Sequence, residues 1–260
     1  MSTAVPVRKL QIDNMLVRVY QDRRQMGMAA AMYIAEKMRE LIAEKSNIRM
    51  IFAAAPSQDE TLAALIEQPN VNWSKVTAFH MDEYLGLPPE APQRFGRYLA
   101  ERLFAKVPFA KVHYIDPKAV DHRQDCDRYS ALLHQSVIDI VCMGIGENGH
   151  IAFNDPGVAD AEEPQWVKTV ALDDKSRLQQ VNDGCFSSLD AVPRQAITLT
   201  VPALMAAHYL YCMVPGPRKA DAVTRTITGT VDITACPATA MRRHPNVMLF
   251  LDQDSSARLP

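Results

Sequence analysis

The chain has 260 residues, of which 48% are hydrophobic and 22% are charged, and its formal net charge is −2. This composition is that of an ordinary globular protein with a sizeable core, and the near-neutral charge gives no electrostatic attraction for nucleic acid or an anionic membrane surface. No apolar run approaches the ~20 residues that span a bilayer. We therefore expect no membrane segment, and no export signal at the N-terminus.

The cysteines and histidines point to no metal site. The five cysteines are dispersed and show no Cys-x-x-Cys spacing, and the seven histidines show neither HxH nor HExxH spacing. We therefore expect no metal ion. An odd and scattered set of cysteines favours reduced thiols and hence a cytoplasmic location.

The first quarter of the chain predicts a helix, a strand and a second helix. Residues 23–45 place Ala, Met, Ile and Leu at helical spacing, and residues 48–55, IRMIFAAA, have the composition of a buried strand. Ser57 and Glu60 follow with the spacing of a capping box. The free N–H groups of a helix that begins there would suit an anion, with Ser57 and Gln58 beside it, although Ser57 could equally act as a cap alone.

A second strand is predicted over KVTAFHMD, and it ends at Asp82. The next segment, EYLGLPPEAPQRFG, is marked as a loop by its Pro and Gly residues. A carboxylate at the end of a buried strand lies where α/β sheets form their ligand crevice, but such a residue more often caps the next turn. Helices over 94–105 and 119–135, with a short strand at VHYI between them, complete this half.

The most distinctive stretch is residues 138–156. An apolar run over 138–145 predicts a buried strand, which three closely spaced glycines then interrupt. Four polar side chains follow within eight positions, namely Asn148, His150, Asn154 and Asp155. A histidine in a strand-end loop can exchange protons near neutral pH. The same pattern also fits a glycine turn whose histidine only hydrogen-bonds to the backbone.

The remaining chain continues the alternation. VKTVALDD leads into a polar segment that carries Arg177, which we expect to be a free cation, and ITLTVPALMAA and HYLYCMV are strand-like. Lys219 lies in the first turn of the helical segment that follows. Because a lysine there opposes the helix dipole, an anionic ligand would explain it, although a solvated surface lysine is an equal alternative. A short helix at 238–243 and a strand at 246–252 end the pattern.

Strands and helices thus alternate along the whole chain. This order predicts a Rossmann-like, three-layer α/β fold, in which an open and mostly parallel sheet carries helices on both faces. No repeat, low-complexity tract or flexible linker divides the sequence. We therefore expect residues 1–260 to form a single domain.

Two motifs resemble a known family. MDEYLGLP at 81–88 and GIGENGHIAFNDP at 144–156 are similar to the two signature loops of the glucosamine-6-phosphate deaminase/isomerase family, which also includes the 6-phosphogluconolactonases. A looser similarity extends from about residue 20 to 253. Both loops resemble the deaminase branch more than the lactonase branch.

The resemblance implies that an amino-sugar 6-phosphate is converted to a ketose 6-phosphate with loss of ammonia. Asp82 would then be the base that moves a proton from C2 to C1. His150 would open the sugar ring with Asp155 as its partner, and Lys219 would bind the phosphate. The reaction needs no organic cofactor. The partner implied is a small sugar phosphate, and members of the family often form homo-oligomers.

Three positions depart from the family pattern. Asn148 stands where the family usually has an Asp, so Asp155 would carry the negative charge alone while Asn148 orients the imidazole. AAAPSQDET replaces the glycine-rich phosphate loop, which leaves Ser57 and Gln58 to contact the phosphate. The position of an arginine that helps to hold the phosphate falls near Asn182, although Arg177 lies close by.

Two other functions are compatible with this sequence. A lactone hydrolase would use His150 as the base for water and would need no carboxylate at Asp82, and its product would be an aldonate instead of a ketose. A non-catalytic sugar-phosphate sensor would explain Asn148 and the missing glycines, and it would bind its ligand without turnover.

Overall fold

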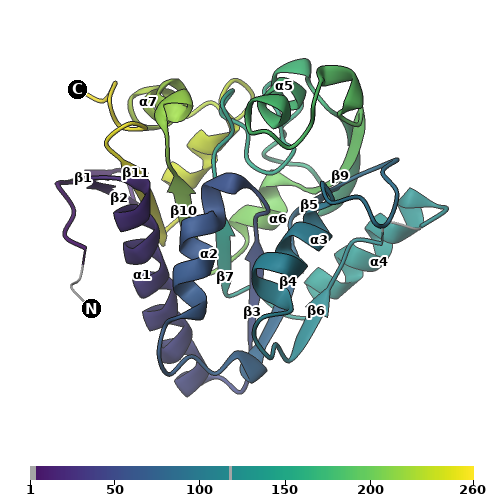
Figure 1. Ribbon diagram of the computed structural model, residues 1–260, viewed down its shortest axis with the longest axis horizontal. Coiled ribbons are helices and arrows are strands. Elements are labelled where there is room, and N and C mark those ends of the chain that lie inside the picture. The colour runs from purple at the N-terminus through teal and green to yellow at the C-terminus, as the bar shows by residue number, and fades with distance from the viewer. Residues whose placement is uncertain (1–3, 117–118) are drawn as a thin grey trace.

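A computed structural model describes residues 4–116 and 119–260 and shows a large central sheet with helices packed against it (Figure 1). Every neighbouring pair in this sheet is parallel except the antiparallel pair β1–β2. The prediction of a mostly parallel sheet is therefore confirmed. The eight strands, in their order across the sheet, are β1 (Arg8–Ile12), β2 (Met15–Tyr20), β11 (Val247–Asp252), β10 (Tyr209–Val214), β7 (Ile140–Met143), β3 (Ile48–Phe52), β4 (Val76–His80) and β6 (Lys111–His113).

Helices cover both faces of this sheet, as predicted. Successive strand residues point to opposite faces, so Met50 and Phe52 of β3 enter one hydrophobic cluster and Ile51 enters the other. The first cluster includes side chains of α1 (Arg23–Glu44), α2 (Asp59–Ile66) and α3 (Phe95–Leu99). The second includes side chains of α4 (His122–His134), α6 (Val201–Met205) and α7 (Ala220–Thr228). The fold is therefore a three-layer α/β architecture.

A small antiparallel sheet lies beside the large one. It has the order β5 (Asp82–Tyr84), β9 (Gln195–Leu199) and β8 (Val167–Ala171). The prediction that Asp82 ends a strand is wrong, because β4 stops at His80 and Asp82 begins β5. The segment after Asp82 is therefore not all loop, since the register Asp82↔Thr198 ties it to β9.

The sequence ITLTVPALMAA is a strand only in its first half. After β9 ends, Thr200 becomes the N-cap of α6, and its side chain accepts a hydrogen bond from the backbone N–H of Ala203. Pro202 lies in the first turn, where its missing N–H costs nothing. The β-branched residues predicted a strand here, but the cap and the proline produce a helix.

The capping box predicted at Ser57 and Glu60 does not form. Ser57 lies in the short helix η1 (Pro56–Gln58), and α2 begins after Gln58 without a side-chain cap. Glu60 instead forms an ion pair with Arg23 at 2.5 Å. Ser57 is thereby released from capping and lies at the carboxyl end of β3.

The remaining helices are short. α5 (Asp174–Asn182) follows β8, and a π-turn, η3 (Ala100–Phe104), continues α3. The 3-10 helices are η2 (Trp73–Lys75), η4 (Leu189–Ala191), η5 (Pro217–Lys219) and η6 (Pro237–Arg243). Within the described ranges, no helix combines the length and the apolar character needed to cross a membrane.

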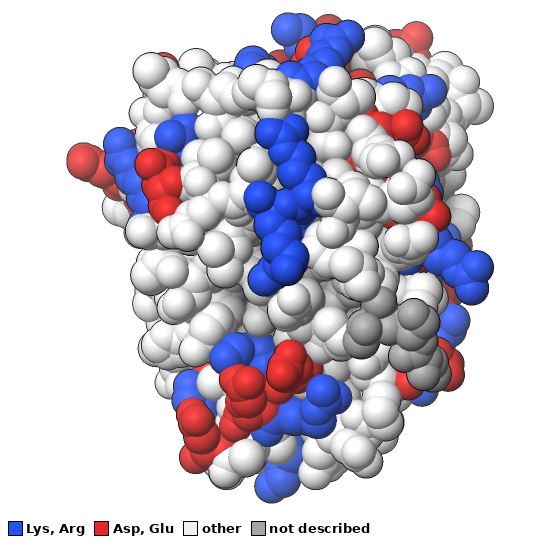
Figure 2. Space-filling model, turned by 90° about the vertical axis from the view of Figure 1, so that its left-hand side faces the viewer, with Lys and Arg blue, Asp and Glu red and all other residues white. Residues whose placement is uncertain are grey.

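One face of the molecule, on the side of β1 and β2, carries charges of both signs. Figure 2 shows a short row of basic side chains in the middle of this face, a mixed group of acidic and basic side chains below it, and wide uncharged areas around them. This mixture agrees with the formal net charge of −2.

Candidate active site

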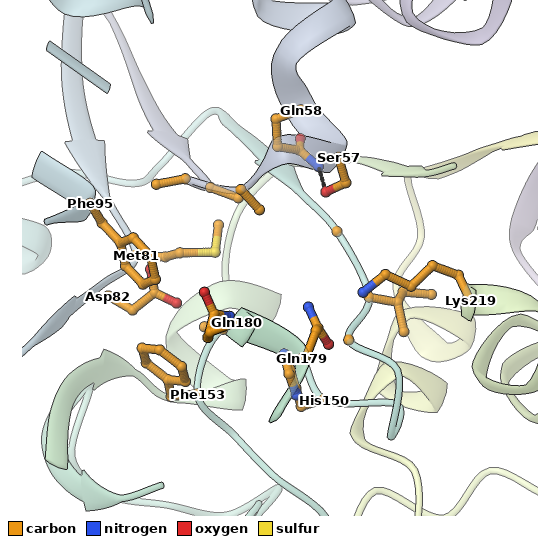
Figure 3. Close-up of a pocket in the computed structure, with 17 residues that line it drawn as sticks. Ser57, Gln58, Met81, Asp82, Phe95, His150, Phe153, Gln179, Gln180 and Lys219 are labelled. Carbon is orange, nitrogen blue, oxygen red and sulfur yellow. Dashed lines mark hydrogen bonds between the residues drawn. The ribbon is translucent and has the colours of Figure 1, made fainter. Parts of the chain in front are cut away.

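A cavity opens at the carboxyl ends of the central strands. This position is where open α/β sheets bind their ligands. In the view of Figure 3, Asp82 lies on one side, Lys219 on the other, and Gln179 and Gln180 between them. The lining residues with polar side chains are Ser57, Gln58, Asp82, His150, Gln179, Gln180 and Lys219.

His150 lies against the backbone of the loop after β7. A Cβ atom at Gly146 would come within 2.2–2.4 Å of three atoms of the His150 imidazole, so no residue with a side chain fits there without moving the ring. Gly149, at φ 92°, provides the left-handed turn that returns the chain to His150. Two of the three glycines therefore have identifiable roles in placing this histidine.

Asp155 lies behind His150 and is held by several donors. Its Oδ1 lies 3.2 Å from His150 Nδ1, accepts a hydrogen bond of 2.9 Å from Asn148 Nδ2 and accepts another from the Ser176 hydroxyl. Asn148 Oδ1 accepts from the backbone N–H of His150 at 3.0 Å. Asn148 therefore orients His150 through its backbone and through Asp155, not by contact with the imidazole ring.

These donors keep Asp155 ionised. Burial by itself raises the pKa of Asp155, but the hydrogen bonds and charge of His150, together with the bonds from Ser176 and Asn148, outweigh it and lower the pKa to about 2. The carboxylate is thus negative at physiological pH.

Asp82 has the opposite environment. Its side chain is buried at the cavity wall, and within residues 4–116 and 119–260 no group donates a hydrogen bond to its carboxylate. Burial, with a smaller contribution from the charge of Glu83, raises the pKa of Asp82 well above its usual range. Beneath it, His80 contacts the Asp82 carbonyl oxygen at 2.8 Å and fixes the backbone. Such a carboxylate is suited to take up and release a proton.

Lys219 lies at the end of η5, directly before α7, and its side chain lines the cavity. It is 7% exposed, and burial lowers its pKa. It forms no ion pair in the described part of the chain. Across the cavity, Gln58 donates hydrogen bonds to Met213 O and Ser57 Oγ at 3.2 and 3.0 Å. A buried ammonium group without an ion pair, in the same cavity as the Ser57 hydroxyl, is suited to an anion.

Arg177 is not the free cation that the sequence predicted. Its side chain is buried and does not line the cavity. It pairs with Asp174 at 2.7 Å and donates to the carbonyl oxygens of Leu189 and Val192 at 2.6 and 3.2 Å. Its role in the structure is to hold α5 against the segment around η4.

Three polar side chains of the site were missed from the sequence, and all come from α5. Ser176, Gln179 and Gln180 have the i, i+3, i+4 spacing of one helical face. Gln179 also accepts a hydrogen bond of 2.8 Å from the backbone N–H of Glu147 in the loop beside His150. The sequence of α5, DKSRLQQVN, is mostly polar, and this composition alone does not tell a buried polar face from a solvated one.

The structure thus brings most of the predicted residues together. Asp82, His150, Ser57, Gln58 and Lys219 line the cavity, with Asn148 and Asp155 directly behind His150. In the described ranges, no three His, Cys, Asp or Glu side chains come together in a way that could hold a metal ion.

Comparison with known proteins agrees with this geometry. Residues 21–249 match the family described as glucosamine-6-phosphate isomerases/6-phosphogluconolactonase. A glucosamine-6-phosphate deaminase of Halothermothrix orenii is 32% identical over 94% of this chain and all of its own length. A second, from an Exiguobacterium species, is 37% identical over 75% of this chain and 74% of its own.

Solved structures give the same result. A monomeric glucosamine-6-phosphate deaminase superposes with a TM-score of 0.84 at 26% identity, covering 93% of this chain and 98% of that one. The 6-phosphogluconolactonase of Thermotoga maritima shares the fold, with a TM-score of 0.73 at 21% identity over 92% of this chain and 99% of its own. The resemblance seen in the two sequence motifs is confirmed, and the chain belongs to the glucosamine-6-phosphate isomerase/6-phosphogluconolactonase family.

Proposed function

We propose that this protein converts glucosamine 6-phosphate, or a closely related amino-sugar phosphate, and water to fructose 6-phosphate and ammonia. The observation that carries the proposal is the combination of groups at the cavity. In the described residues, the Asp82 carboxylate accepts no hydrogen bond, Lys219 forms no ion pair, and His150 is paired with Asp155. The curated relatives with 32% and 37% identity, both glucosamine-6-phosphate deaminases, support the same assignment.

The first steps follow from the positions of these groups. Lys219 and Ser57 bind the phosphate, which places the sugar between Asp82 and His150. His150 moves the proton between the anomeric hydroxyl and the ring oxygen, and this opens the ring to the free aldehyde. Asp155 keeps the imidazole oriented and stabilises its protonated form.

Asp82 then carries out the isomerisation. Its carboxylate takes the proton from C2 while the C1 oxygen gains a proton from water, which gives an enolamine with a hydroxyl group on C1. The same carboxyl group then returns its proton to C1, and the nitrogen gives one proton back to water. The product is an imine at C2. Water adds to this imine and ammonia leaves, so the ketose is formed without any change in oxidation state overall. No organic cofactor is required for these steps.

The test is a coupled assay that follows ammonia and fructose 6-phosphate together after addition of glucosamine 6-phosphate. Equal amounts of the two products are expected. Formation of an aldonate from 6-phosphogluconolactone, with no ketose from the amino sugar, would assign the chain to the lactonase reaction instead. Binding of glucosamine 6-phosphate without turnover at any enzyme concentration would identify a sensor.

The phosphate contact has its own test. Lys219→Met is expected to raise KM for glucosamine 6-phosphate by roughly 10- to 100-fold, because a hydrogen bond to a charged group contributes about 1.5–3 kcal/mol. The same variant is expected to bind glucosamine without phosphate as weakly as the parent does. An unchanged KM would place the phosphate elsewhere.

The five cysteines are free thiols, which supports placing this reaction in a reducing compartment such as the cytoplasm. Association into homo-oligomers remains a prediction from the family resemblance.

A further inference from the structure

The serine of α5 occupies a position between the two partners of the proposed ring-opening group. Ser176 is 1% exposed, and its Oγ lies 2.8 Å from His150 Nδ1 and contacts Asp155 Oδ1 in a short hydrogen bond. It therefore bridges the imidazole and the carboxylate from a helix that neither of them belongs to.

The chemistry of the three groups fixes the direction of these bonds. An ionised carboxylate only accepts, so the single hydroxyl proton of Ser176 is donated to Asp155. The hydroxyl oxygen can then only accept from His150, which requires the proton on Nδ1. Nε2 is left without a proton, and it has no partner in the described part of the chain.

We propose that Ser176 is a positioning residue that, together with Asp155, holds His150 in the Nδ1–H tautomer and so presents a proton-free Nε2 to the bound sugar. This inference rests on the proposed function for the identity of the sugar. The assignment of the tautomer rests on the geometry alone.

The replacement of an acidic residue by Asn148 gives this serine its importance. The amide of Asn148 donates to Asp155 and accepts from a backbone N–H, so it supplies no negative charge to the imidazole. The carboxylate of Asp155 is the one negative group in contact with His150 in the described ranges. It reaches the ring directly and also through the hydroxyl group of Ser176.

Helix α5 also fixes Asp155 itself. The backbone N–H of Asp173, the N-cap of α5, donates to Asp155 Oδ2 at 3.4 Å, while Ser176 in the next turn binds Oδ1. The positive end of the helix dipole therefore faces the carboxylate. Gln179 and Gln180 of the same helix line the cavity. The position of α5 therefore both aligns the His150–Asp155 pair and completes the wall of the sugar site.

The direct test is ¹⁵N NMR of the full-length protein labelled in histidine, at a pH where His150 is neutral. The expected spectrum of the parent shows a protonated Nδ1 and an unprotonated Nε2 for His150. A protonated Nε2 in the parent would overturn the proposal, whether or not any variant folds. Because no turnover is needed, this result is independent of the proposed function.

Variants at Ser176 provide the kinetic readout. Ser176→Ala is expected to lower kcat roughly tenfold, in the range found for groups that orient a catalytic ligand or base, with little change in KM. The pH profile of kcat/KM is expected to change as well, because the hydroxyl that bridges the imidazole and the carboxylate is lost. Ser176→Thr, which keeps the hydroxyl, is expected to restore both.

A matched control lies on the surface. Ser130 contacts Nδ1 of His134 at 3.4 Å on α4, away from the cavity. Ser130→Ala removes a serine–histidine contact of the same kind and is expected to leave kcat and the pH profile unchanged. A Ser176→Ala variant that keeps the parental kcat and pH profile would overturn the proposal. If glucosamine 6-phosphate gave no products at all, the proposed function would fail while the tautomer assignment stood.

Discussion

Asp82 and Asp155 are both buried at the same site, at 7% and 1% exposed, yet their pKa values move in opposite directions. Asp155 accepts from Asn148, Ser176 and a backbone N–H and lies beside His150. No group in residues 4–116 and 119–260 donates to Asp82. The comparison teaches that burial alone does not decide whether a carboxyl group is charged, because the hydrogen-bond donors around it do.

Opposite pKa shifts of this kind separate the two roles of an acid–base site. Asp82, with a raised pKa, can exchange a proton with a carbon atom of the sugar. Asp155, with its pKa lowered to about 2, keeps its charge and serves as the fixed partner of His150. Four predictions test this division, beginning with the largest expected effect.

The most direct test of these two roles is a substitution at Asp82. Asp82→Asn removes the group that takes the proton, and we expect kcat to fall by about 10³-fold or more, since general-base catalysis contributes about 10²–10⁴. Asp155→Asn is expected to cost only about 10–100-fold, because His150 remains in place. Steady-state release of fructose 6-phosphate measures both variants. A larger loss for Asp155→Asn would reverse the two roles.

The pairing of Asp155 with His150 depends on the backbone against which the imidazole packs. Gly146→Ala is expected to lower kcat by about 10²-fold, the cost of a displacement of about 1 Å at an active site, because the new Cβ would occupy the place of the His150 ring. Gly144→Ala is a milder change in the same loop, since its Cβ would meet Gln58 Nε2 at 3.1 Å and would leave the His150 ring in place. Equal losses of kcat in the two variants would show that the position of His150 is not what matters.

The amide of Asn148 is one of the donors that Asp155 has and Asp82 lacks. Asn148→Asp restores the residue usual in the family, but here it replaces a donor to Asp155 Oδ1 at 2.9 Å by a second negative charge. We expect kcat to fall severalfold. One carboxyl pKa of the new pair is expected to rise, so the native state binds an extra proton and the variant loses stability as pH increases through that raised pKa. Thermal melts between acidic and neutral pH measure this loss, and a variant faster than its parent would contradict the prediction.

The smallest effect concerns stability at neutral pH. Asp155, with its pKa lowered from 3.8 to about 2, contributes about 2 kcal/mol that is present above pH 4 and lost as pH falls toward 2. Asp82 contributes in the opposite sense, because its raised pKa makes the native state lose stability as pH increases. Urea unfolding at pH 7 should therefore show Asp155→Asn less stable than the parent and Asp82→Asn slightly more stable. Equal stabilities would show that the two environments do not differ as described.

Much of the fold was predictable because its signals are local. Alternating helical and apolar segments predicted the parallel sheet, and the strand-end positions of His150 and Lys219 follow from the runs that precede them. β5 escaped prediction because three residues are too few to show a period, and its partner β9 is more than a hundred residues away. The hairpin of β1 and β2 was also missed, although the sequence of β2, MLVRVY, is largely apolar.

The contribution of α5 could not be predicted for a different reason. Nothing in the spacing of Ser176, Gln179 and Gln180 distinguishes a buried polar face from a solvated one. The same limit produced the error at Arg177, since a free and a buried arginine have the same sequence signal. Only the position of α5 relative to Asp155 decides both. That residues 1–260 form a single domain remains a prediction.

The pairing of β5 with β9 has one further consequence. Asp82 and Glu83 are adjacent, and the alternation of a strand turns one toward the cavity and the other toward the backbone N–H groups of Phe95 and Gly96. Sliding the pair by one residue would exchange the two carboxylates. The register of β5 on β9 therefore decides which of the two carboxylates faces the cavity. Length changes in the loop after Tyr84 leave the selection intact, whereas a single residue inserted between Met81 and Tyr84 would place the wrong acid beside the sugar.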